Sequence, residues 1–144
     1  MTFDAQLRST LQSIHAKPTA GEARAIIDVA RLAAAADKKT DLGETVMLLG
    51  LSKIVCEMAG VTEIPDPAAK IDPQRLAEIG EQLVPNGARE LAYASAFLIM
   101  ISDLELTKEE SQLANGLADA LVIDGQRAKQ LASQMETLVR SARK

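Results

Sequence analysis

The segment from Leu91 to Ile101 limits most narrowly what this chain can fold into. Its residues are apolar or small on every side of a helical wheel, so a helix there has to be enclosed by other helices. Directly after it the chain becomes acidic, passing Asp103 and Glu105 before Glu110. The segment therefore predicts a central core helix that ends in carboxylates, within an all-α fold.

The rest of the chain fits a helical bundle. No stretch shows a convincing period-two alternation, so no sheet is predicted. A length of 144 residues suffices for one domain with a sizeable core, and we expect a single compact bundle over residues 1–144. Apolar spacings of three and four, with the capping and breaking residues between them, predict about seven helices. They cover residues 2–15, 22–36, 41–60, 73–84, 87–102, 107–121 and 124–142.

The arrangement at Asp103 occurs once before in the sequence. An Ala-rich helix runs into Asp37, and Glu44 follows seven residues later, as Glu110 follows Asp103. Both turns therefore read D-x6-E. Shifting one copy by 66 residues places Asp37 on Asp103 and Glu44 on Glu110. This indicates two related helix–acidic turn–helix halves, over about residues 22–60 and 87–122.

The acidic turns have two interpretations. Glu44 and Glu110 each come three residues after a capping residue, Asp41 or Thr107, where a carboxylate stabilises a helix N-terminus by about 1 kcal/mol. Capping alone explains these two residues. Asp37 and Asp103 instead follow apolar helices, at the end where the helix dipole disfavours negative charge. An Asx-turn or a bound cation would each offset that cost.

A cation site would be built from oxygen ligands alone, which select Ca²⁺, Mg²⁺ or Mn²⁺. The candidate metal ligands share acidic side chains in or beside the two turns: Asp37, Asp41, Glu44, Asp103, Glu105 and Glu110. An EF-hand is excluded, because its twelfth position requires a bidentate Glu and holds Leu48 or Ala114 here.

With these residues the chain resembles the TerB family of tellurite-resistance-associated helical domains. The resemblance covers roughly residues 25–135 and is carried by A-A-A-A-D-K-K-T-D-L-G-E at Ala33–Glu44 and by the segment from Ala94 to about Leu121. It implies a helical bundle of two related halves, with Asp37, Glu44, Asp103 and Glu110 chelating a divalent cation. The family usually has glycine after each aspartate, where this chain has lysine and leucine.

Composition and single residues argue against several other classes. The net charge of −4 and an aromatic content of 2% disfavour nucleic-acid binding and ring-stacking ligands. Cys56 and His15 are the only residues of their types, so no cysteine zinc site, disulfide or catalytic triad is expected. No signal peptide or membrane-length apolar run is evident, which makes a cytoplasmic protein without membrane insertion the expectation.

The sequence thus predicts a non-enzymatic domain. The leading hypothesis is divalent-cation binding at the acidic turns, coupled to interaction with a protein partner in a stress response to tellurite or metal, the setting that the resemblance suggests. The alternative is a structural interaction or dimerisation module without metal, in which exposed apolar side chains mark the interface.

Overall fold

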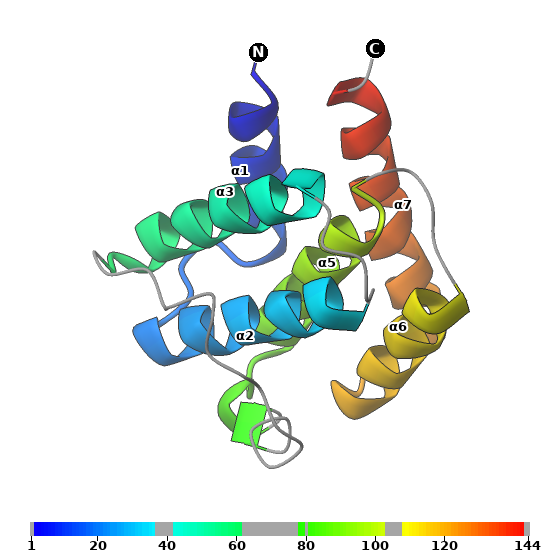
Figure 1. The fold of residues 1–144 in the computed structure, drawn as a ribbon. Coiled ribbons are helices and arrows are strands. Elements are labelled where there is room, and N and C mark those ends of the chain that lie inside the picture. Colours follow the sequence, from blue (N-terminus) through cyan, green and yellow to red (C-terminus); the bar gives the residue numbers. More distant parts are fainter. Residues whose placement is uncertain (1, 37–41, 62–77, 80, 103–107, 143–144) are drawn as a thin grey trace.

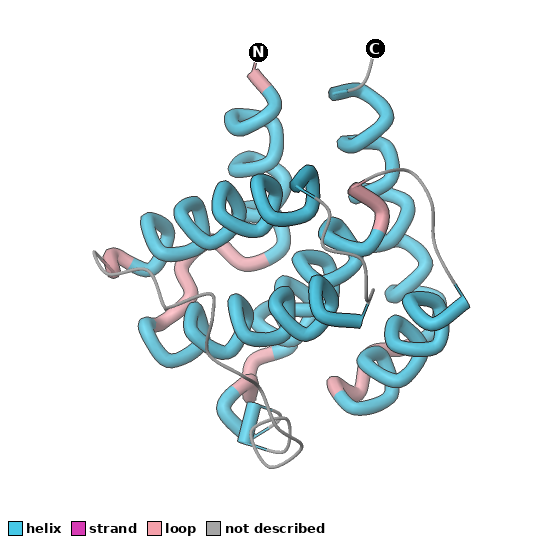
Figure 2. Tube along the Cα trace, viewed as in Figure 1, coloured by secondary structure: helices cyan, strands magenta, loops and turns pink. Residues whose placement is uncertain are grey.

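The computed structural model describes residues 2–36, 42–61, 78–79, 81–102 and 108–142. This part of the chain consists of helices and connecting turns, with no strand (Figure 2). The prediction of an all-α bundle is confirmed. Six helices have defined bounds: α1 Phe3–Ile14, α2 Ala20–Ala36, α3 Leu42–Ala59, α5 Asn86–Met100, α6 Lys108–Ala120 and α7 Gly125–Ala142.

The predicted helix over residues 73–84 lies largely outside the described residues. Residues 78–79 and 81–82 are helical, and Ile79 and Leu83 are buried, as the apolar spacing predicts. The sequence predicts one further helix here, between α3 and α5, but its start and end lie outside what the structure describes.

Helix α5 is the centre of the bundle. Every residue from Leu91 to Met100 is buried, which confirms the prediction of an enclosed core helix. It packs most extensively on α2 and also contacts α7, α6, α1 and α3 (Figure 1). The alanines of α2 and α5, among them Ala30 and Ala92, let the two backbones approach closely, because a methyl side chain adds little width to the contact.

Two helices end in the left-handed conformation. The backbone φ of Gly60 is 73°, and Val61 N donates to Cys56 O at 2.8 Å, which closes a Schellman motif after α3. The helix predicted over residues 41–60 thus ends where the sequence places its end. Val122 occupies the same place after α6 with φ 56°, and there Ile123 N donates to Ala118 O at 2.9 Å.

The start of α2 differs from the prediction. The sequence suggests a break through Gly21, whereas the helix begins at Ala20. The reason is a capping box: Glu22 N donates to Thr19 Oγ1, and Thr19 N donates to Glu22 Oε1, both at 3.1 Å. His15, which follows α1, places its Nε2 3.0 Å from the same Glu22 oxygen.

Gly87 completes this junction of three helices. It is the second residue of α5, and a Cβ on it would lie 2.8 Å from His15 Nδ1 and 3.3 Å from Ile14 O. The close approach of α5 to the end of α1 therefore requires a residue without a side chain.

We predict that Gly87→Ala destabilises the protein by roughly 1–3 kcal/mol, since the added methyl group overpacks the contact with His15. Gly116→Ala is the matched control, because a Cβ at Gly116 meets nothing within 4 Å and alanine should stabilise α6 by about 1 kcal/mol. Urea unfolding of both variants measures the two effects. Equal changes in the two would contradict the packing described here.

Candidate functional site

Most of the predicted metal ligands are not part of the described structure. Asp37, Asp41, Asp103 and Glu105 lie outside the described residues. Glu44 falls in the first turn of α3, but the structure does not describe its side chain. The prediction that these carboxylates gather around a cation is thus neither confirmed nor contradicted.

Glu110 is the one predicted ligand with a described side chain. It is the third residue of α6 and is only 1% exposed. Glu110 takes part in a polar or electrostatic interaction. A buried carboxylate in the first turn of a helix is stabilised by the N–H groups of that turn, as a cap would be. The position of Glu110 thus agrees with the capping interpretation, and its role as a cation ligand stays a prediction.

A buried ion pair in α2 was not foreseen from the sequence. Arg31 Nη1 lies 3.0 Å from Asp28 Oδ1, and the two side chains are 6% and 4% exposed. Because α2 packs on both α5 and α6, this pair belongs to the same group of packed helices as Glu110. Asp28 interrupts the run Ile26–Ala30, which is otherwise apolar, and that interruption was the signal available in the sequence.

The described residues contain no group of three or more His, Cys, Asp or Glu side chains close enough to hold a metal ion. Five of the six predicted ligands, all but Glu110, have side chains outside this search. The cation site therefore remains a prediction from the repeat.

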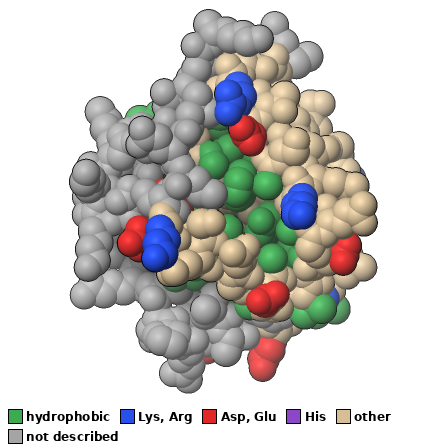
Figure 3. Space-filling model, turned by 90° about the vertical axis from the view of Figure 1, so that its right-hand side faces the viewer, with side chains coloured by type: hydrophobic (Ala, Val, Ile, Leu, Met, Phe, Trp, Pro, Cys, Tyr) green, Lys and Arg blue, Asp and Glu red, His purple; other side chains and the backbone are tan. Residues whose placement is uncertain are grey.

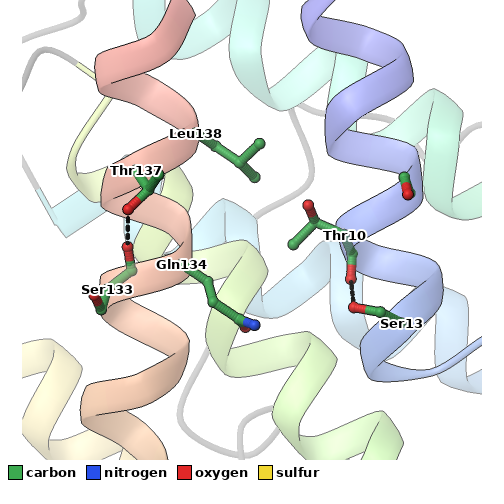
Figure 4. Close-up of a pocket in the computed structure, with 7 residues that line it drawn as sticks. Thr10, Ser13, Ser133, Gln134, Thr137 and Leu138 are labelled. Carbon is green, nitrogen blue, oxygen red and sulfur yellow. Dashed lines mark hydrogen bonds between the residues drawn. The ribbon is translucent and has the colours of Figure 1, made fainter.

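A groove of about 410 Å³ runs between α1 and α7. Figure 4 shows Thr10 and Ser13 of α1 on one side, with Ser133, Gln134 and Thr137 of α7 on the other. The hydroxyls of Thr10, Ser13 and Thr137 donate to carbonyl oxygens of their own helices. No carboxylate, imidazole or thiol is among the described residues that line it, so the groove offers no acid–base pair for catalysis.

The lone cysteine, Cys56, is buried. Burial raises the pKa of the Cys56 thiol, which disfavours the reactive thiolate. Burial also raises the pKa of the Tyr93 phenol, and this ring stacks on Phe97 within the core. Both groups therefore read as packing residues.

Helix α3 carries exposed apolar side chains. Val46 and Leu49, one turn apart on this helix, are 61% and 47% exposed. The inward side of the same helix contributes Leu51, Ile54 and Val55 to the core. We call the outward set Val46, Leu49 and Lys53 the α3 face.

On a different side of the molecule, toward α6 and α7, both acidic and basic side chains lie around a group of hydrophobic ones (Figure 3). Within the described part of the chain, no helix is long and apolar enough to cross a membrane.

Comparisons of the chain with models of known protein families, with curated proteins and with solved structures find no match. The likeness to TerB domains therefore rests on the two acidic turns and the apolar helices before them.

We predict that Arg31→Met lowers the free energy of unfolding by about 3 kcal/mol, because it removes a buried guanidinium facing the Asp28 carboxylate. Arg140→Met is the control: Arg140 also pairs within its helix, with Glu136, but both side chains are largely exposed, and the loss should be below about 1 kcal/mol. Chemical denaturation compares the two. A small loss in Arg31→Met would mean that the buried pair contributes little.

Proposed function

We propose that this chain is a non-catalytic helical domain of the TerB type that acts by binding a protein partner through the α3 face. The observation that carries the proposal is the exposure of Val46 and Leu49 on one side of a helix whose other side is in the core. Exposed apolar side chains that adjoin one another on a helix are typical of a surface that a partner covers.

Gly50 supports this assignment. It is half-buried and lies within α3 beside Leu49, and a Cβ on it would meet nothing within 4 Å. Glycine inside a helix costs about 1 kcal/mol relative to alanine, and the packing of this chain does not require it. A glycine next to the α3 face would let a partner helix approach closely.

A cation at the acidic turns would be coupled to this surface through the chain itself. The first acidic turn leads directly into α3, and Glu44 lies in the first turn of that helix. A divalent ion bound by Asp37 and Glu44 would fix the start of the helix that carries the α3 face. The setting in tellurite or metal stress rests on the resemblance alone.

The alternative is an interaction or dimerisation module without metal. It shares the α3 face with the leading proposal and differs in attributing the acidic turns to helix capping and Asx-turns. The partner would then be recognised without any ion, and a second copy of the chain is one candidate.

We predict that the parent protein self-associates at high concentration if the partner is a second copy, and that Leu49→Glu abolishes the association by placing a carboxylate in the apolar contact. Sedimentation over a concentration series measures it. Val122→Glu is the control, because Val122 is still more exposed and lies on the turn after α6. Monomeric parent protein at every concentration would eliminate the homodimer and leave a different protein as the partner.

We predict that millimolar Ca²⁺, Mg²⁺ or Mn²⁺ raises the thermal unfolding midpoint of the chelator-treated protein. A cation that binds only the folded state increases the free energy of unfolding by RT ln(1 + [L]/Kd), which is about 2.7 kcal/mol at a hundredfold excess over Kd. The double variant Asp37→Asn/Asp103→Asn should lose this response. If no cation shifts the midpoint of the parent, the metal-free alternative is the correct one.

A further inference from the structure

A small polar pocket lies where the start of α5 meets the turn between α6 and α7. Its volume is about 210 Å³. Asn86, Arg89 and Glu90 line it from α5, and Val122, Asp124 and Arg127 line it from the turn and α7. The pocket contains none of the acidic-turn residues and no residue of the α3 face, so it is independent of the function proposed above.

The charge of Arg127 is compensated inside the pocket. Its Nε lies 2.7 Å from Glu90 Oε1, and its Nη1 donates to Gln130 Oε1 at 3.2 Å. This ion pair links α7 to α5. Because the two charges compensate each other, neither Arg127 nor Glu90 is expected to bind a charged ligand strongly.

Arg89 differs from Arg127. Its Nε donates to Leu83 O at 2.6 Å, and no carboxylate among the described residues forms an ion pair with it. The contact with Leu83 fixes one edge of the planar guanidinium. A guanidinium has five N–H donors, and among the described residues no partner is found for the terminal N–H groups of Arg89. Within that part of the chain they are available to water or to a ligand.

Asp124 also lines the pocket, and no ion pair joins it to Arg89 among the described residues. It directly precedes Gly125, the first residue of α7, where a carboxylate is stabilised by the N-terminal end of the helix. At the start of α5 the residue in the corresponding place is Pro85, and no side chain caps that helix. The first turn of α5 therefore adds positive partial charge on the side of the pocket that holds Asn86 and Arg89.

We propose that this pocket binds an oxyanion, a carboxylate or phosphate group, with Arg89 as the main donor and the Asn86 amide as a second. Arginine suits this role, because its fork of N–H groups matches two oxygens of a carboxylate or phosphate. The volume admits such a group with a few attached atoms and is smaller than the sites that hold drug-sized ligands.

The test is a titration of the isotope-labelled protein with inorganic phosphate and, separately, with acetate, followed by backbone amide chemical shifts. Sodium chloride at the same ionic strength is the reference for screening. The expected result is saturable shifts at Asn86, Gly87 and Arg89 with phosphate, acetate or both, and none with chloride. The stronger ligand of the two identifies which oxyanion the pocket prefers.

Arg89→Gln should weaken binding roughly tenfold or more, because it removes charge-assisted hydrogen bonds. Arg140→Gln removes an equal charge from the exposed end of α7 and should leave the affinity unchanged. Arg89→Lys keeps the positive charge but lacks the paired N–H groups of the guanidinium, so it should bind the oxyanion more weakly than the parent. If Arg89→Gln does not fold, the affinity of Arg89→Lys tests the proposal instead. Absence of saturable shifts in the parent, or parent-like affinity in the Arg89 variants, would overturn the proposal.

Discussion

The burial of α5 on all sides is the constraint on which the rest of the structure depends. A helix with no exposed face needs neighbours around its whole circumference, and here α2, α3, α6, α7 and α1 provide them. Because aromatic residues make up only 2% of the chain, the core is filled by aliphatic side chains and by alanine, which brings helix axes close together. Close packing of this kind explains why a single methyl group at Gly87 has no room beside His15.

Much of this fold can be predicted from the sequence. The apolar stripe Leu131, Met135, Leu138 of α7 and the continuous apolar run of α5 are both buried as their spacings predict, because hydrophobic periodicity reports directly on which sides of a helix leave water. The start of α2 was misplaced, although Thr19 and Glu22 have capping-box spacing, because Pro18 and Gly21 suggested a turn that the two reciprocal hydrogen bonds override.

The candidate sites were less predictable, since they depend on what long-range packing brings together. Asp28 and Arg31 are three residues apart, but periodicity alone does not distinguish an exposed helical pair from a buried one. The pocket around Arg89 combines the start of α5 with the turn before α7, and no local pattern joins residues 86–90 to residues 122–127. Exposure of Val46 and Leu49 was also hidden, because an apolar run without polar interruption reads as core on every side.

Two contacts position α3, the helix that is proposed to bind a partner. Leu51 and Val55 anchor one side of the helix in the core, and the ion pair between Arg8 and Glu57 ties its C-terminal part to α1. If a partner binds the α3 face, as proposed above, this anchoring would lower the entropic cost of association. The N-terminal end of the same helix follows the first acidic turn. A cation bound at that turn would order the N-terminal end of α3. Because the same helix carries the α3 face, affinity for a partner would then depend on the cation.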